Sequence, residues 1–118
     1  MTDSNISGWG SMNKVNVKLF SPINTDSIKK IIENLSKESI ISRGLGRSYG
    51  DAAQLKGGNV ILLDKFNNIS LNEKNNSIKV GAGVSFSSLL SYLVPKGFFL
   101  PVTPGTKNIT VGGAIASD

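Results

Sequence analysis

Residues 43–51 read Arg-Gly-Leu-Gly-Arg-Ser-Tyr-Gly-Asp, and they contain both arginines of the chain. Every other basic residue is a lysine. Arginine presents a planar fork of donors that pairs with phosphate oxygens, whereas lysine is a compact point charge. Glycines allow left-handed backbone angles and let backbone N–H groups approach a ligand closely. This stretch, the arginine loop, therefore predicts an anion-binding site, in the first place for a phosphate or pyrophosphate.

The residues before the arginine loop predict a βαβ unit. Apolar and polar residues alternate over residues 15–20, which indicates a half-buried strand. Apolar residues recur at helical spacing over residues 28–35, and Thr25 or Asp26 is the expected N-cap of this amphipathic helix. Residues 40–42 are typical of a short buried strand. The loop thus follows the carboxyl end of a strand, where α/β sheets favour ligands.

The residues after the loop predict further strands. Residues 60–63 are a continuous apolar run, which is typical of an interior strand. Residues 69–72 and 78–80 flank a polar stretch, and this pattern indicates a hairpin around Asn75. Residues 98–100 are short and apolar, and they fit either a strand or packed coil.

A second amphipathic helix is expected after Ser85, which is a suitable N-cap. Its apolar face lies within residues 86–93, and Pro95 ends it. The pattern as a whole predicts an α+β fold, with a βαβ unit, a small mixed sheet and two amphipathic helices. We expect residues 1–13 to be a polar lead-in and residues 14–118 to be one domain or part of one.

Trp9 and Asp51 each allow two interpretations. Trp9 lies between two glycines in the polar lead-in, and we favour a surface anchor over a position at the edge of a ligand. An ionised Asp51 would repel a bound phosphate. We therefore favour a role for Asp51 within the loop, as a cap for backbone N–H groups or as a partner of Arg43 or Arg47, over a contact with a ribose hydroxyl.

Composition narrows the possible chemistry. The 118 residues include no cysteine and no histidine, so they provide no disulfide, no thiolate, none of the usual zinc sites built on these residues and no imidazole acid–base group. The net charge of +5 comes mostly from dispersed lysines, which favours solubility and an anionic ligand over a nucleic-acid surface. No apolar run is long enough for a transmembrane helix. A cytoplasmic location is the default expectation, with association at a membrane surface as the alternative.

Known glycine motifs do not account for the arginine loop. A Rossmann fingerprint would need a glycine at Tyr49, and no Gly-Lys-Ser/Thr ending is present for a P-loop. A second run of small residues follows at 104–106 and 110–118. Two such runs would suit the enclosure of one extended dinucleotide. The alternative is a purely structural loop with its arginines in solvent.

Together, residues 43–51, 104–106 and 110–118 resemble the FAD-binding domain of the vanillyl-alcohol-oxidase (PCMH) type. Within that superfamily the sequence is most similar to FAD-linked sugar oxidases of the decaprenylphosphoryl-β-D-ribose oxidase kind. The resemblance implies the first subdomain of such a domain and the start of the second. Because the pattern stops in mid-motif, we expect the sequence to be the N-terminal part of a longer protein and to be inactive alone.

The resemblance also implies a cofactor site. Residues 42–52 would surround the FAD pyrophosphate, and the second run would line the flavin and its ribityl chain. Many relatives have a flavin-linking histidine in the first loop, but Arg47-Ser48-Tyr49-Gly50 stands there, so FAD is expected to be held non-covalently. The implied cofactor-binding residues are Ser42, Arg43, Gly44, Leu45, Gly46, Arg47, Ser48, Tyr49, Gly50, Asp51, Gly105, Thr106, Thr110, Val111, Gly112, Gly113, Ser117 and Asp118.

The implied function is oxidation of a hydroxyl on a sugar or on a lipid-phosphate-linked sugar by an FAD-dependent oxidoreductase that acts on CH–OH groups. Catalytic residues are expected beyond Asp118, no metal is expected, and a short-chain dehydrogenase is the partner that the resemblance suggests. The alternatives are an aldonolactone or alditol oxidase of the same superfamily, and a non-redox module that binds a phosphorylated ligand or nucleic acid.

Overall fold

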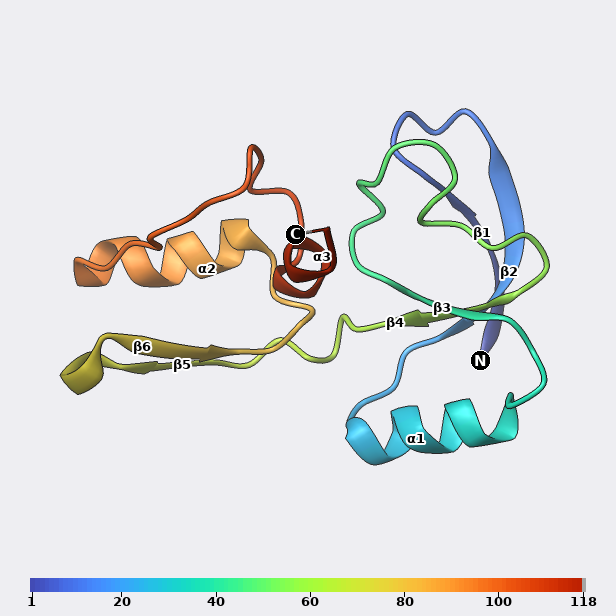
Figure 1. The fold of residues 1–118 in the computed structure, drawn as a ribbon, viewed down its shortest axis with the longest axis horizontal. Helices are drawn as coiled ribbons and strands as arrows, with labels where there is room; N and C mark the ends of the chain where they lie inside the picture. Colours follow the sequence, from blue (N-terminus) through green and yellow to red (C-terminus); the bar gives the residue numbers. More distant parts are fainter. Residues whose placement is uncertain (118) are drawn as a thin grey trace.

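The computed structural model describes residues 1–117 and has two halves (Figure 1). In the sheet half, four strands pack with one helix, and in the hairpin half, two strands pack with a second helix; a third helix lies between the halves. The predicted α+β class is confirmed. The elements are β1 (Thr2–Ser7), β2 (Lys14–Phe20), α1 (Thr25–Asn34), β3 (Ile40–Arg43), β4 (Asn59–Leu62), β5 (Ile69–Asn72), β6 (Ser77–Val80), α2 (Phe86–Leu93) and α3 (Val111–Ser117).

The sheet half confirms the predicted βαβ unit and adds a strand to its middle. The strand order is β1-β2-β4-β3, and β4 runs parallel to both β2 and β3. Val60 of β4 is opposite Leu19 of β2 and Ile41 of β3, and it is completely buried. The apolar run at 60–63 therefore gives an interior strand, as its sequence predicts. Figure 1 shows α1 on one side of this sheet and the long connection after β3 on the other.

The lead-in at residues 1–13 contains a strand that the sequence did not predict. In β1, Thr2 to Ser7 pair antiparallel with β2, from Leu19 back to Lys14. An edge strand covers little of a core, so its side chains need not alternate between apolar and polar. Backbone pairing holds β1 in place, and backbone pairing leaves no signature in composition.

The helix α1 begins one or two residues earlier than expected. Its N-cap is Asn24, whose side chain accepts a hydrogen bond from the Ser27 backbone N–H at 2.9 Å. The Ser27 hydroxyl in turn accepts from the Asn24 backbone N–H, so the pair forms a capping box. The prediction of Thr25 or Asp26 as the cap was wrong, because those residues already belong to the first turn.

The hairpin half matches its predicted outline. β5 and β6 are antiparallel, and Asn76 completes their connection with a left-handed φ of 51°. Ser85 caps α2 by accepting from the Ser88 N–H, as predicted. Residues 98–100 form no strand; Phe98 and Leu100 are packed coil against the core around Leu89.

The helix α3 was not predicted, because Gly112 and Gly113 stand in its first turn and glycine weakens helix propensity. Backbone acceptors elsewhere in the fold support its start. The Val111 N–H donates to the Val84 carbonyl at 2.8 Å, and the Gly112 N–H donates to the Ala82 carbonyl at 2.9 Å. The Thr110 hydroxyl accepts from the Gly113 N–H at 3.1 Å. Tertiary contacts thus place a helix between the two halves.

Candidate functional site

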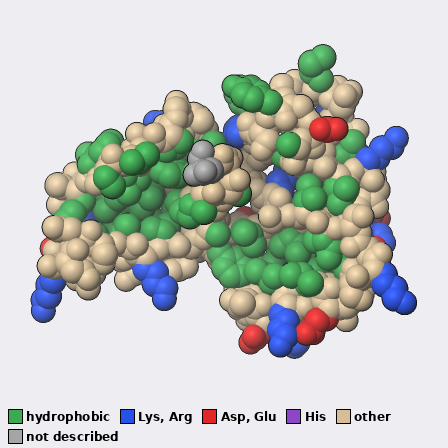
Figure 2. Space-filling model, in the orientation of Figure 1, with side chains coloured by type: hydrophobic (Ala, Val, Ile, Leu, Met, Phe, Trp, Pro, Cys, Tyr) green, Lys and Arg blue, Asp and Glu red, His purple; other side chains and the backbone are tan. Residues whose placement is uncertain are grey.

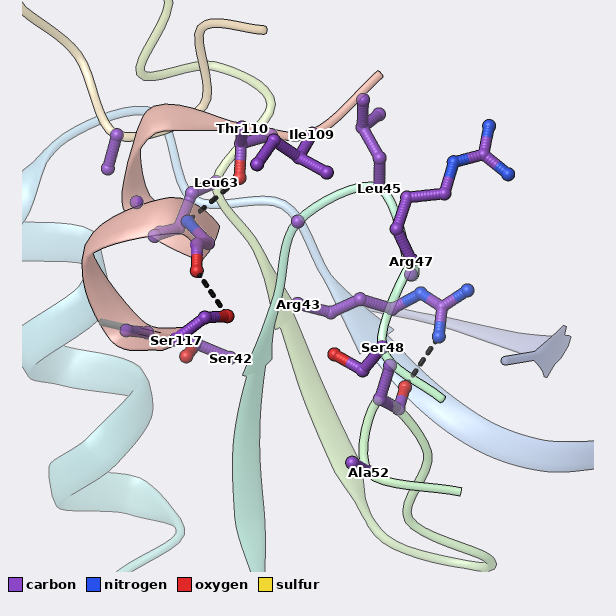
Figure 3. Close-up of a pocket in the computed structure, with 17 residues that line it drawn as sticks. Ser42, Arg43, Leu45, Arg47, Ser48, Ala52, Leu63, Ile109, Thr110 and Ser117 are labelled. Atoms are coloured by element: carbon purple, nitrogen blue, oxygen red, sulfur yellow. Dashed lines mark hydrogen bonds between the residues drawn. The ribbon is translucent and has the colours of Figure 1, made fainter. Parts of the chain in front are cut away.

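A cavity of about 360 Å³ lies where the arginine loop meets α3 (Figure 3). Small side chains and glycine backbone form much of its wall, so the peptide groups themselves are accessible from inside. The lining residues are Ser42, Arg43, Gly44, Leu45, Gly46, Arg47, Ser48, Ala52, Ala53, Leu63, Ala82, Ile109, Thr110, Gly112, Gly113, Ala116 and Ser117.

The cavity brings together the two glycine-rich runs that the sequence pairs. The expected site residues that line it are Ser42, Arg43, Gly44, Leu45, Gly46, Arg47, Ser48, Thr110, Gly112, Gly113 and Ser117. The expected site residues outside its lining are Tyr49, Gly50, Asp51, Gly105, Thr106 and Val111. Tyr49 is 84% exposed, and Val111 packs against the core of the hairpin half instead. Asp118, the last expected residue, lies outside the described residues.

Five lining residues were not expected from the sequence. Three of them are alanines, and an alanine gives no chemical signal by itself. The position of Ala82 between Gly81 and Gly83 could have indicated it, because it extends a run of small residues. The unexpected residues are Ala53, Leu63, Ala82, Ile109 and Ala116.

The glycines of the site allow backbone segments to approach closely. A Cβ added at Gly44 would lie 2.4 Å from the Thr110 hydroxyl, and one added at Gly83 would lie 1.9 Å from the Leu63 carbonyl oxygen. Real Cβ atoms do not approach so closely, so a larger residue at either position would force neighbouring atoms to shift, namely the Thr110 side chain or the Leu63 backbone. These contacts bring the arginine loop, the end of β4 and α3 around one space.

Arg43 does not point a free guanidinium at an anion. Its Nη2 donates to the Ser7 carbonyl at 2.6 Å, and its Nη1 donates to the Ala53 carbonyl (Figure 3 shows the second bond). Partial burial lowers the pKa of Arg43 from its usual value. Backbone carbonyls therefore accept from two of the five N–H donors of Arg43, and the hypothesis that Arg43 binds a phosphate stays a prediction.

Arg47 lies at the outer edge of the loop. Its guanidinium lies 5.2 Å from the centre of the Trp9 ring, and its Nε donates to the Asn108 carbonyl at 3.3 Å. In Figure 3 the Arg47 side chain extends away from the helix that carries Ser117. Trp9 is 54% exposed and contacts the loop from outside, which agrees with the favoured role as an anchor.

The loop presents a row of unengaged backbone donors. Among residues 1–117, no acceptor is hydrogen-bonded to the backbone N–H groups of Leu45 to Gly50. Gly46 and Gly50 have left-handed φ angles of 65° and 61°, which turn successive peptide groups. Successive N–H groups of this kind form anion-binding concavities.

Asp51 does not play the part that we favoured for it. Its side chain is exposed, and within the described residues its carboxylate forms no ion pair and caps no N–H group of the loop. Its backbone carbonyl accepts from the Gln54 N–H at 2.8 Å, which closes the turn after the loop. The turn is therefore held by backbone groups, and the carboxylate stays in solvent.

Two further features are absent from residues 1–117. Within that range no group of three or more His, Cys, Asp or Glu side chains is placed to hold a metal ion. None of the helices described there is long and apolar enough to cross a membrane.

Solved structures share this fold. A cholesterol oxidase of Brevibacterium sterolicum, in a mutant form, superposes with a TM-score of 0.82 at 16% identity, over 98% of this chain and 24% of the oxidase. A variant of a protein named BBE-like 1 from Physcomitrella patens superposes with a TM-score of 0.73 at 16% identity, over 91% of this chain and 24% of that one. At such identities the likeness shows the fold alone.

Curated proteins with similar sequences, together with a match to a family model, identify the family of this chain. Decaprenylphosphoryl-β-D-ribose oxidase of Mycolicibacterium smegmatis is 38% identical over 99% of this chain and 26% of its own length. The glycolate oxidase subunit GlcD of Bacillus subtilis is 32% identical over 82% of this chain and 22% of its own length. The chain thus spans about a quarter of the length of these curated relatives. Residues 18–118 match the FAD binding domain family, and the chain belongs to that family.

Proposed function

We propose that this chain holds FAD non-covalently in the cavity between the arginine loop and α3, as part of an oxidoreductase that acts on CH–OH groups. The observation that carries the proposal is the row of unengaged N–H groups in the arginine loop, because the residues from Leu45 to Ser48 that contribute to it line that cavity. A diphosphate needs several donors held in advance, and this loop offers them without any side chain.

The cavity has the size and chemistry for part of a dinucleotide. Sites for small molecules and cofactors are commonly about 300–1,000 Å³, so 360 Å³ lies near the lower limit of that range. In this proposal residues 42–52 hold the pyrophosphate. The flavin and ribityl chain are assigned to the expected residues on the α3 side of the cavity, namely Thr110, Gly112, Gly113 and Ser117, whereas roles for Gly105, Thr106 and Asp118 stay predictions.

When bound, FAD supplies the redox chemistry, which is the acceptance of a hydride from the carbon of a CH–OH group. The protein binds the cofactor and positions the walls of the cavity around it. Backbone N–H groups bind the charged part of the cofactor, and the glycine contacts between Gly44 and Thr110 keep the walls close. Because the chain has no histidine and no cysteine, none of its residues offers the usual covalent attachment to the flavin.

The substrate class that we favour is a sugar carried on a lipid phosphate. Its support is the 38% identity to decaprenylphosphoryl-β-D-ribose oxidase, which spans nearly the whole chain. Glycolate oxidase subunit GlcD and D-lactate dehydrogenase, by their names, act on smaller hydroxy acids, and they are 32% and 28% identical. An aldonolactone or alditol oxidase stays the alternative, and the short-chain dehydrogenase partner and the cytoplasmic location stay predictions.

A nucleic-acid-binding module has less support. On the face shown in Figure 2, Lys and Arg side chains are scattered and do not form a stripe. A phosphate-backbone footprint is normally a clustered basic surface. The charge distribution on this face therefore favours a small anionic ligand.

The test uses the whole protein that contains this chain. Purified protein should show flavin absorption bands that survive dialysis, and denaturation should release FAD to the filtrate. Colourless protein that also fails to bind added FAD contradicts the proposal, and flavin that stays on the denatured polypeptide contradicts non-covalent binding. A steep loss of nucleic-acid affinity with rising salt would support the alternative module instead.

A further inference from the structure

The guanidinium of Arg43 lies directly beneath the arginine loop. A Cβ added at Gly46 would be 2.2 Å from its Nη2, so the guanidinium packs against the Gly46 backbone. Gly46 has a left-handed φ of 65° and is itself buried. The loop therefore turns over the Arg43 head group at this glycine.

The same head group joins two other segments. Its hydrogen bonds go to the carbonyls of Ser7, at the end of β1, and Ala53, in the stretch that returns from the loop. Both acceptors are backbone oxygens, which orient a rigid planar fork better than a flexible ammonium. Arg43 thus ties the first strand, the loop and its return into one unit.

The N-terminal segment strengthens this unit from outside. The Trp9 N–H donates to the Ser48 carbonyl at 3.4 Å. A Cβ added at Gly8 would lie 2.4 Å from the Gly50 carbonyl oxygen, so Gly8 is in close contact with the far end of the loop. Residues 7–9 therefore contact the loop at several points, although their sequence reads as a lead-in.

We propose that Arg43 is a positioning residue for the diphosphate of FAD: it fixes the shape of the arginine loop from beneath, and the N-terminal segment is the other part of this brace. In the described residues no carboxylate is ion-paired with Arg43, so its positive charge is also available to favour an anion in the cavity that it lines. This inference rests on the proposed function for its ligand, but the brace itself can be measured without FAD.

The brace predicts a local effect of Arg43→Met in the whole protein without cofactor. Two backbone hydrogen bonds report the loop shape, from the Trp9 N–H to Ser48 and from the Gln54 N–H to Asp51. Hydrogen exchange at Trp9 and Gln54 should accelerate by about tenfold or more, the size expected for one lost charge-assisted hydrogen bond. Exchange at Asn59, whose N–H bonds to the Ser39 carbonyl in the sheet, should stay unchanged.

Arg43→Met should also raise the Kd for added FAD by about tenfold or more, because a charge-assisted hydrogen bond that holds the loop is lost. Lys56→Met is the matched control, because Lys56 is exposed, lies in the same return segment and loses the same charge. Lys56→Met should change neither the hydrogen exchange at Trp9 and Gln54 nor the Kd for FAD. Arg43→Lys keeps the charge but cannot reach both carbonyls, so its effect should stay close to that of Arg43→Met.

Three results would overturn the inference. One is an FAD Kd for Arg43→Met within about twofold of the unmodified protein. A second is full rescue by Arg43→Lys, which would reduce the role to charge alone. The third is faster exchange at Asn59 as well, which would mean general loss of stability. If the unmodified protein fails to bind FAD, the proposed function fails, whereas the exchange measurement still decides whether the brace exists.

Discussion

Gly44 and Thr110 are in such close contact that a Cβ at Gly44 would lie 2.4 Å from the Thr110 hydroxyl oxygen. Gly44 begins the connection after β3, and Thr110 directly precedes α3, so this contact joins the sheet half to the helix between the halves. The same hydroxyl accepts the Gly113 N–H. One pair of residues therefore sets the separation of two cavity walls.

Gly44→Ala should destabilise the protein by about 1–3 kcal/mol, because the added methyl group forces the loop and Thr110 apart. The flavin content of the purified protein should fall with it. Denaturant unfolding and the flavin-to-protein absorbance ratio measure the two effects. Gly105→Ala is the control for stability, since its added Cβ meets nothing within 4 Å. Equal free energies of unfolding for Gly44→Ala and Gly105→Ala would contradict the close contact between Gly44 and Thr110.

Arg47→Lys should weaken FAD retention about two- to fivefold, the size of an exposed cation–π contact. Lysine loses both the stacking on Trp9 and the Nε hydrogen bond to Asn108, which hold the outer edge of the loop. The rise of flavin fluorescence on dilution measures cofactor release. Trp9→Leu should have a similar effect, and the double variant should be little worse than either alone. Unchanged release would assign Arg47 a scaffold role apart from the cofactor.

Asn24→Ala should lower the free energy of unfolding by about 1 kcal/mol, the usual cost of a lost N-cap. The Asn24 side chain accepts the Ser27 N–H, which would then have no acceptor within the first turn. Urea unfolding measures the change. Thr25→Ala is the comparison, because the structure places Thr25 inside the helix and gives it no cap. A larger loss of stability in Thr25→Ala than in Asn24→Ala would indicate that Thr25 is the N-cap, as the sequence predicted.

Ser21→Ala should reduce stability at neutral pH and have little effect in acid. The Ser21 hydroxyl donates to Asp64, and this hydrogen bond is the main reason that the pKa of Asp64 is lowered. A carboxyl whose pKa is lower in the folded state adds stability above its unfolded pKa of about 3.9, and that stability is lost as pH falls through the folded value. Asp64 is largely exposed, so the effect should stay below about 1 kcal/mol. The free energy of unfolding of Ser21→Ala and of the unmodified protein, measured at pH 7 and at low pH, tests this pH dependence. A stability difference between the two proteins that grows in acid would contradict the prediction.

Strong periodic patterns allowed much of the fold to be predicted. The alternation before Pro22, the apolar run of β4 and the Ser85 cap each gave the element that its pattern indicates. β1 and α3 were missed for a shared reason: partners elsewhere in the chain hold them. β1 pairs along β2, and the start of α3 donates to Val84 and Ala82. Such partners leave no local sequence signal.

The candidate site could be located from its glycines and arginines, but the geometry of those arginines could not. Rarity of arginine singled out the right loop, and the second glycine-rich run does lie across the cavity from it. The acceptors of Arg43 are the carbonyls of Ser7 and Ala53, and every residue has a carbonyl. Which carbonyl meets a given guanidinium depends on the three-dimensional course of the chain, so composition alone suggested a phosphate where the structure has two peptide oxygens.

The position of β4 has a consequence for synthesis of the protein on the ribosome. β4 is one of the two interior strands of the sheet half but the last of its four strands to be made. Until residues 59–62 emerge, β2 and β3 both have an open edge that can pair with another chain. Parallel pairing between strands distant in sequence is also slow. The arginine loop belongs to the segment that delivers this closing strand, so changes in the loop should alter the yield of folded chains as well as the binding of a cofactor.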